Sequence, residues 1–283
     1  MTPRLTVLGA GVMGTGITAL ALGHGLPVTL VDIDPAVLEA ARASVDRQLR
    51  HAQLLGATPD GVAAGELTTT TSVADSAGSL AVVEAVTEHA EQKDKILREV
   101  SGLVAPGTVL ISNTSGIPID ELAASVERPD DLVGIHFMNP SYLIKMVEVV
   151  RGPRTGDRTM ESVQALLDRL GRRGIVVHDS PGFVTSRLLH PMINTAARLV
   201  GEGVASAEQV DALMAGCLGH PTGPLRTADL IGLDNLADSL VAMSERLGDD
   251  GYRPCDHLLD LVGAGRLGRK SGAGFYEYDG TTT

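Results

Sequence analysis

The sequence predicts an α/β protein: an open, mostly parallel β-sheet with helices on both faces, followed by an all-helical C-terminal domain. Two observations predict this class. Short β-type segments alternate with helical patterns over roughly the first 180 of the 283 residues, which is typical of a parallel sheet. From Thr185 onward helical periodicity prevails. We place the boundary at Asp179–Gly182 and expect domains over residues 1–180 and 181–283.

The first domain is expected to open with two strand–helix units. Leu5–Leu8 is a β-type run, and Met13–Leu22 is an apolar helix that two glycines end. Val28–Val31 is the second strand. Asp34 followed by proline combines an N-cap with proline at the first helical position, which predicts a helix over Pro35–Leu55.

The rest of the first domain continues the alternation. Five further strands are expected, over Leu80–Val83, Thr108–Ser112, Leu132–Ile135, Met146–Val150 and Ile175–Val177. Helices are expected over Ala90–Leu103, Pro118–Val126 and Thr159–Leu170. The threonine run Thr68–Thr71 is interpreted as a loop.

The second domain is expected to contain three helices. Thr185–Val204 has the length of one long helix, and Ser206-x-x-Gln209 is a capping box that starts a second. Thr227–Leu247 predicts a third helix, and Phe275–Tyr278 is read as a strand.

Composition disfavours several classes of function. The 23 Lys and Arg against 35 Asp and Glu give a net charge of −12, which argues against nucleic acid or an anionic membrane as partner. No run of about 18 apolar residues predicts a transmembrane helix, and no secretory signal opens the chain. Cys217 and Cys255 lack metal-ligand spacing. We therefore expect a cytoplasmic protein without a metal centre.

A glycine-rich turn stands between the first strand and the first helix. It reads G-x-G-x-x-G: the first glycine allows a tight turn, the second lets backbone approach a pyrophosphate, and the third lets helix pack on strand. Asp32 ends the second strand, where a carboxylate can bind a ribose 2′-hydroxyl and would repel a 2′-phosphate. The pattern predicts a Rossmann-type domain that binds NAD rather than NADP. The expected contacts are Gly9, Ala10, Gly11, Val12, Met13, Gly14 and Asp32. The alternative is an ordinary strand–turn–helix with a solvated Asp32.

A histidine and a glutamate are placed for proton transfer. His136 follows a strand, at the edge where open parallel sheets bind ligands. Imidazole can take a proton from an alcohol while hydride leaves to nicotinamide. Glu148 lies on the next strand, from which its carboxylate could orient the imidazole. The alternative is a structural histidine and a surface glutamate, and spacing alone favours neither interpretation.

Asn113 and Ser115 follow another strand at a strand-to-helix turn. They either face the ligand edge or cap the following helix. The residue pattern alone favours the capping interpretation, because short polar residues are the commonest helix caps.

Taken in order, these segments resemble the 3-hydroxyacyl-CoA dehydrogenase family. The matches run nearly end to end: Gly9–Gly14 with Asp32, Glu84–Glu88 with Lys93, Ser112–Ser115, Gly134–Pro140, Lys145–Val150, Pro181–Val184, Gly223–Leu225, Ala228–Asp234 and Gly268–Tyr276. The resemblance implies reversible, NAD-linked interconversion of 3-hydroxyacyl and 3-oxoacyl thioesters. It also implies a cleft between a Rossmann-type domain and a helical domain that usually forms a homodimer.

The resemblance implies a role for each matching residue. His136 would be the catalytic base and Glu148 its carboxylate partner. Ser115 would hydrogen-bond the substrate hydroxyl, and Asn139 belongs to the family's catalytic-loop motif. Further cofactor contacts would be Glu88, Lys93, Asn113 and Lys270.

Two departures from the family pattern bear on the substrate. Ser186 stands where the family carries an asparagine that faces the site, and serine offers one donor instead of two. Val45–Glu66 contains no lysine, whereas this stretch is lysine-rich in CoA-using members. Either free CoA binds weakly, or the arginines Arg47 and Arg50 suffice.

One subgroup of the family fits both departures and is the leading hypothesis. Its members oxidise the C3 hydroxyl of a glyceryl group on an acyl carrier protein to the semialdehyde, in the synthesis of polyketide extender units (methoxymalonyl or hydroxymalonyl). The chain is similar to this subgroup over Cys217–His220, Thr222–Asp229 and Tyr252–Cys255.

An acidic carrier protein would need a basic patch on this chain. The candidates are Arg151, Arg154, Arg158, Arg172 and Arg173, unless they form a merely solvated face. The first alternative is a 3-hydroxybutyryl-CoA dehydrogenase, which would bind free CoA. The second is a non-catalytic NAD-binding scaffold, against which the joint presence of His136, Glu148 and Ser115 argues.

Overall fold

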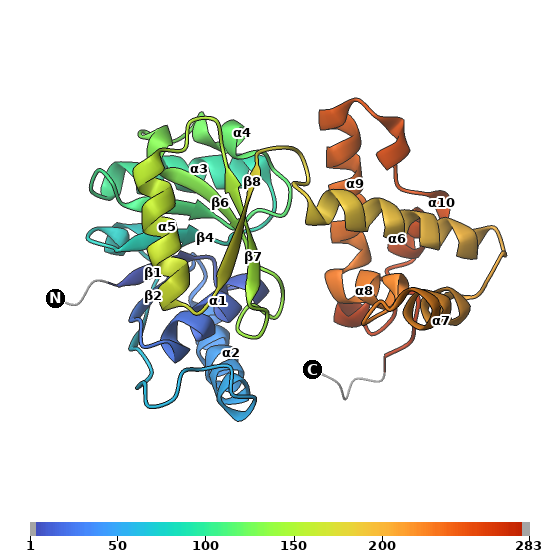
Figure 1. Cartoon of the computed structure of the whole chain (residues 1–283), viewed down its shortest axis with the longest axis horizontal. Helices are drawn as coiled ribbons and strands as arrows, with labels where there is room; N and C mark the ends of the chain where they lie inside the picture. Colours follow the sequence, from blue (N-terminus) through green and yellow to red (C-terminus); the bar gives the residue numbers. More distant parts are fainter. Residues whose placement is uncertain (1–3, 279–283) are drawn as a thin grey trace. The chain divides into compact units, whose positions relative to one another are not determined.

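The computed structural model describes residues 4–278, in two compact units, Met1–Ser180 and Pro181–Thr283 (Figure 1). The first unit contains an eight-stranded sheet in the order β3-β2-β1-β4-β5-β6-β7-β8. The strands are β1 (Leu5–Leu8), β2 (Val28–Val31), β3 (Leu67–Thr70), β4 (Ala81–Glu84), β5 (Val109–Ser112), β6 (Leu132–His136), β7 (Met146–Arg151) and β8 (Arg173–His178). All neighbours are parallel except β6 and β7, which are antiparallel.

Helices cover both faces of this sheet. They are α1 (Val12–Gly23), α2 (Pro35–Leu54), α3 (Ala90–Leu103), α4 (Ile119–Ala123) and α5 (Asp157–Arg169). A Cβ on Gly174 of β8 would meet Leu167 of α5, whereas one on Gly134 of β6 would meet Ile119 of α4. Because the alternation of β7 points Val149 and Val150 to opposite faces, α5 and α4 lie on opposite sides of the sheet.

The strands of the sheet centre are buried on both faces. β1, β2, β4 and β5 are buried at every position, which is why each reads as a continuous apolar run with few polar residues. Helix α1 packs against α2 and is itself almost wholly buried. These elements share one core, to which Val7, Ile17 and Val149 belong.

The second unit is helical. It comprises α6 (Thr185–Gly201), α7 (Ala207–Leu218), α8 (Pro224–Ile231), α9 (Leu233–Leu247) and α10 (Asp256–Gly263). The expected capping box is present at the start of α7, where Ser206 and Gln209 bond reciprocally. Its core contains Ile193, Leu225, Leu236 and Leu258. The predicted class, a mostly parallel α/β domain followed by a helical domain, is confirmed.

Three predicted segments are wrong. Thr68–Thr70 belongs to β3, which pairs in parallel with β2, and not to a loop. Thr227–Leu247 is interrupted at Gly232, whose φ of 98° is incompatible with a continuous helix and separates α8 from α9. Phe275–Tyr278 forms no strand: the segment contains one isolated bridge, from Glu277 to Ala273.

Within residues 4–278, no helix has both the length and the apolar character needed to cross a membrane.

Candidate active site

The glycine turn after β1 is shaped by contacts at its first and last glycines. Gly9 has φ of 96°, and a Cβ there would lie 2.6 Å from the Ala85 carbonyl oxygen. A Cβ on Gly14 would lie 1.8 Å from the Gly9 carbonyl oxygen. By contrast, a Cβ on Gly11 would have no neighbour within 4 Å. The open space is therefore at the position where a pyrophosphate approaches the backbone in this motif.

Among the residues that the structure describes, no side chain caps the N-terminus of α1. Gly11 is the N-cap residue, and Thr15 donates its backbone N–H to the Gly11 carbonyl at 2.9 Å. The N–H groups of Val12, Met13 and Gly14 precede this first helical bond, and Val12 is 69% exposed. Unbonded N–H groups at a helix N-terminus suit an anionic ligand.

Asp32 connects the end of β2 to the glycine turn. One carboxylate oxygen accepts the Ala10 backbone N–H at 2.8 Å, and the other accepts that of Asp34 at 3.1 Å. A carboxylate offers about four acceptor positions. Asp32 can therefore hold the turn and still accept a ribose hydroxyl.

The predicted proton-transfer pair lies on β6 and β7. His136 and Glu148 are directly opposite in the antiparallel register, and Glu148 Oε2 lies 2.8 Å from His136 Nδ1. Their side chains are 11% and 8% exposed. Val147 and Val149 point into the core, so strand alternation turns Glu148 to the same face as His136. This contact favours the tautomer with a proton on Nδ1, which makes Nε2 the proton-accepting nitrogen.

Asn113 ties the end of β5 to the end of β6. Its side-chain oxygen accepts the backbone N–H of Phe137 at 3.0 Å, one residue after His136. Its own backbone N–H donates to the Glu84 carbonyl, at the end of β4. Asn113 therefore lies at the same edge of the sheet as His136.

Glu88 organises the turn that contains Ser115. One carboxylate oxygen accepts the Thr114 hydroxyl at 2.5 Å and the Ser115 backbone N–H at 2.7 Å. Neither Asn113 nor Ser115 caps α4. That role belongs to Asp179, which accepts the backbone N–H groups of Ile119 and Asp120. The capping interpretation favoured by the sequence pattern is therefore wrong.

Lys93 lies inside a cluster of carboxylates. Its Nζ is 2.7 Å from Glu84 and 3.2 Å from Glu88, and its side chain is 1% exposed. Burial lowers the pKa of Lys93, but the two carboxylates outweigh it, and the net shift is upward. Glu84 also accepts the Ser112 hydroxyl at 2.6 Å. Glu88 is 43% exposed and is the member of this cluster that a ligand can reach.

The other predicted site residues are Asn139, three positions after His136, and two residues of the second unit. Asn139 is exposed on the connection between β6 and β7. Ser186 and Lys270 belong to the second unit: Ser186 is buried in the first turn of α6, and Lys270 pairs with Asp234 at 2.6 Å. Burial raises the pKa of Asp234, but its contacts with Lys270 lower it overall.

Sequence reasoning assigned no role to Glu84 or Asp179. The sequence does contain an indication for Glu84, because a glutamate that ends an apolar strand needs a buried partner. No sequence pattern indicates the role of Asp179, because its hydrogen-bond partners are backbone groups 59 and 60 residues away.

The predicted basic patch is incorrect at Arg172, which is buried with 5% exposure. Arg151 pairs with Asp157, and Arg154 pairs with Asp120. The patch therefore presents less free positive charge than its sequence suggests.

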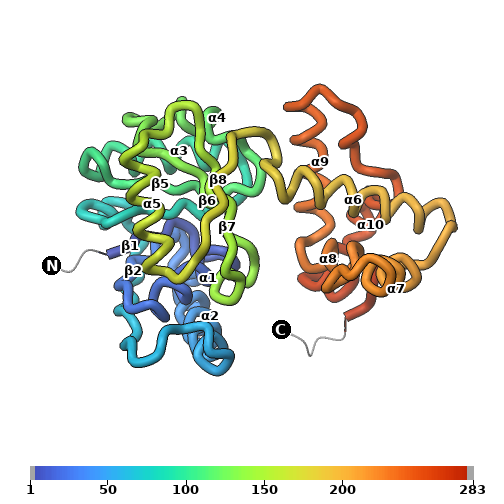
Figure 2. Tube along the Cα trace, viewed as in Figure 1, coloured from blue at the N-terminus to red at the C-terminus, as the bar shows by residue number. Residues whose placement is uncertain are grey.

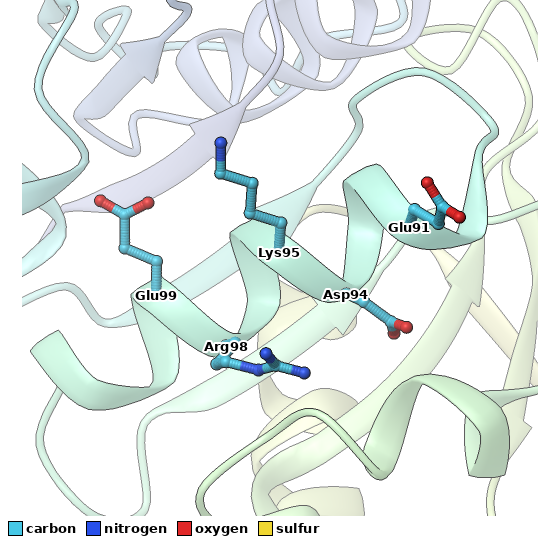
Figure 3. A pocket seen from close by; sticks show the side chains of 5 residues that line it. All are labelled: Glu91, Asp94, Lys95, Arg98 and Glu99. Atoms are coloured by element: carbon cyan, nitrogen blue, oxygen red, sulfur yellow. The ribbon is translucent and has the colours of Figure 1, made fainter.

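A surface hollow on α3 contains none of the predicted site residues. Figure 3 shows five charged side chains that project from this helix: Glu91, Asp94, Lys95, Arg98 and Glu99. Charges of both signs on a solvent-facing helix are typical of a solvated surface.

Both units match models of known domains. Residues 4–180 match the NAD binding domain of 3-hydroxyacyl-CoA dehydrogenase, and residues 182–278 match its C-terminal domain. A probable 3-hydroxybutyryl-CoA dehydrogenase of Bacillus subtilis is 39% identical over 99% of both chains. Another, from Deinococcus radiodurans, is 40% identical over 97% of this chain and 100% of that one.

Solved structures agree with these matches. Mycobacterium tuberculosis FadB2 superposes with a TM-score of 0.91 at 36% identity, over 98% of this chain and 99% of that one. The (S)-3-hydroxybutyryl-CoA dehydrogenase PaaH1 of Ralstonia eutropha gives a TM-score of 0.87 at 37% identity, over 99% and 100% of the two chains.

Proposed function

This chain belongs to the 3-hydroxyacyl-CoA dehydrogenase family, and we propose that its substrate is a short-chain 3-hydroxyacyl-CoA such as 3-hydroxybutyryl-CoA. It is an NAD-dependent oxidoreductase that acts on a CH–OH group. The four-carbon acyl group is the one in the names of relatives 38–40% identical to this chain. These names favour 3-hydroxybutyryl-CoA over the glyceryl-carrier-protein hypothesis.

The observation that supports the chemistry best is the pair formed by His136 and Glu148. With Glu148 bonded to Nδ1, His136 accepts the substrate hydroxyl proton at Nε2. The imidazolium that results is stabilised by the adjacent carboxylate. The pair is largely buried, which strengthens this electrostatic interaction.

The residues at the edge of the sheet fit NAD. The open space at Gly11, the uncapped start of α1 and the remaining acceptor positions of Asp32 are what a dinucleotide requires. When bound, NAD supplies the acceptor for the hydride. We assign to Ser115 and Asn139 the orientation of the substrate, with Ser115 fixed through Glu88. The assigned cofactor contacts are Gly9–Gly14, Asp32, Glu88, Asn113 and Lys270, with Lys93 acting through Glu88.

Three basic residues on α2 support CoA as the carrier. Arg47, Arg50 and His51 are exposed and lie three and four positions apart, on one face of the helix. Of these, Arg47 and Arg50 offer positive charge to a nucleotide phosphate, although the helix contains no lysine.

Glyceryl-acyl carrier protein is the second candidate substrate. It is favoured by Ser186, which is buried at the start of α6 in place of the family's asparagine. A smaller, singly donating side chain there suits an acyl group with different polar contacts. Arg158 and Arg173 are the exposed arginines of the predicted patch for which no ion pair is found within residues 4–278.

Replacing His136 tests the proposed chemistry. His136→Ala should lower kcat by about 10²–10⁴-fold, the usual contribution of a positioned general base. NAD affinity should change less than about twofold, because the glycine turn and Asp32 are unaffected. Initial rates of NADH formation and a fluorescence titration with NAD give the two values. If turnover and NAD affinity fall together, His136 is a structural residue and the assignment is wrong.

We also propose that the chain forms a homodimer through its helical unit. Leu188 of α6 and Leu213 and Leu218 of α7 are 71%, 59% and 66% exposed, which is unusual for three large apolar side chains in one small unit. Sedimentation should give a mass of about 59 kDa, twice the chain's 29.4 kDa. A 29.4 kDa species at micromolar concentration would contradict this proposal.

A further inference from the structure

We propose that Arg172 is a positioning residue for the dehydrogenase reaction, because its buried guanidinium holds the chain segment that joins the strands of His136 and Glu148. This inference rests on the roles proposed above for His136, Glu148 and Asn139. It removes Arg172 from the docking patch expected from the sequence.

Arg172 directly precedes β8 and points away from solvent, with 5% exposure. Its guanidinium donates to the Ser141 carbonyl from Nε at 3.3 Å and from Nη2 at 3.1 Å. Nη2 also donates to the Tyr142 carbonyl at 2.9 Å. Nη1 donates to the carbonyls of Leu170 at 3.3 Å and Gly171 at 3.2 Å. The side chain thus fastens the connection between β6 and β7 to the turn between α5 and β8.

Arg172 holds this position as a cation without an acidic partner. Within residues 4–278, no carboxylate forms an ion pair with it, and carbonyl oxygens accept all of its hydrogen bonds. Burial lowers the pKa of Arg172 to about 10, so it stays protonated at neutral pH. A buried charge that only carbonyl dipoles stabilise costs free energy of folding. The presence of such a charge at this position therefore needs an explanation.

Other contacts hold the same connection. The backbone N–H of Arg173 donates to the Lys145 carbonyl at 2.8 Å. The Tyr142 hydroxyl lies 3.1 Å from His51 Nδ1 on α2. Ser141 packs on α1, since a Cβ on Gly16 would lie 2.5 Å from its hydroxyl oxygen. In Figure 2 the connection accordingly lies beside α1.

The connection that Arg172 holds joins the strand of His136 to the strand of Glu148. It leaves β6 immediately after His136, includes Asn139 and enters β7 two residues before Glu148. Fixing the carbonyls of Ser141 and Tyr142 therefore fixes the backbone on which Asn139 lies. A displacement of about 1 Å in such a segment can cost about a hundredfold in rate.

The geometry requires arginine rather than any cation. A guanidinium has five N–H donors in a rigid plane, and Arg172 uses three of its nitrogen atoms to reach four carbonyls. Lysine would keep the charge but offers a single nitrogen on a flexible stem. Arg172→Lys therefore removes the planar set of N–H donors and keeps the positive charge.

The test compares Arg172→Lys and Arg172→Ala with the matched control Arg169→Ala, which removes a nearby exposed arginine from the last turn of α5. The substrate is whichever thioester the wild-type enzyme oxidises faster. Arg172→Lys should lower kcat/KM for the thioester by about 10–100-fold, with NAD affinity within about twofold of wild type. Low millimolar guanidinium should restore part of the activity of Arg172→Ala and leave wild type unchanged. Arg169→Ala should match wild type.

Two results would overturn the proposal. The first is a kcat/KM of folded Arg172→Lys that equals the kcat/KM of wild type. The other is a loss of NAD affinity in parallel with the loss of turnover, which would indicate general unfolding. Should Arg172→Ala not fold, Arg172→Lys alone decides. The proposed function is tested separately, by wild-type turnover and by His136→Ala, so the two failures are distinguishable.

Discussion

At the scale of single residues, the proposed site is built from side chains that bond to backbone as well as to one another. Asp32 accepts two backbone N–H groups, Asn113 accepts that of Phe137, and Glu88 accepts that of Ser115. Such bonds fix each side chain before any ligand arrives. The pair of His136 and Glu148 follows the same logic, since the register of two strands sets its distance.

Asp32 gives a prediction at this scale. Asp32→Ala should weaken NAD and raise the relative use of NADP, because the mutation removes both a ribose ligand and a negative charge facing a 2′-phosphate. Steady-state kcat/KM with each cofactor measures the preference. Unchanged preference would mean that Asp32 serves only the turn, through Ala10 and Asp34.

The sequence predicts site residues that stand at the end of a strand or in a turn, because their own segment determines where they lie. His136, Glu148, Asp32 and the three motif glycines are predicted on that basis. The structure places the glycine turn and Asp32 after the neighbouring strands β1 and β2, His136 at the end of β6, and Glu148 directly across from His136 on β7. The sequence could not place Arg172, which is indistinguishable in sequence from its exposed neighbour Arg173. Burial of one and exposure of the other depend on contacts with carbonyls 30 and 31 residues away.

At the scale of elements, predictions failed where tertiary contacts override local pattern. The threonines of β3 become a strand because β2 offers them a parallel partner, and threonine suits strands. Gly232 interrupts an otherwise regular helical pattern through its positive φ. Phe275–Tyr278 is fixed by the buried Asp229, which accepts the backbone N–H groups of Phe275 and Tyr276, so no strand partner is required.

The glycine turn gives a prediction about an element. Gly14→Ala should destabilise the first unit, because its Cβ would collide with the Gly9 carbonyl oxygen at 1.8 Å. Gly11→Ala should leave the Tm unchanged but weaken NAD binding, because its Cβ enters space that is open in the protein alone. Thermal unfolding and NAD titration of both variants separate the two roles. A Gly11→Ala variant with wild-type NAD affinity would contradict the placement of the pyrophosphate there.

At the scale of the whole molecule, the chain combines an acidic surface with local basic features. The net charge is −12, yet α2 presents Arg47, Arg50 and His51 on one exposed face. A general negative field would repel CoA and a carrier protein alike, so recognition of either must be local. Composition argues against nucleic acid as a partner, but it does not distinguish these two carriers.

The most direct test of the account follows NADH formation from 3-hydroxybutyryl-CoA and from glyceryl-acyl carrier protein, side by side at equal concentrations. We predict a higher kcat/KM for 3-hydroxybutyryl-CoA, in agreement with the names of the relatives and with the basic face of α2. A higher kcat/KM for glyceryl-acyl carrier protein would contradict this substrate. It would instead give functional meaning to Ser186 and to the absence of lysine from α2.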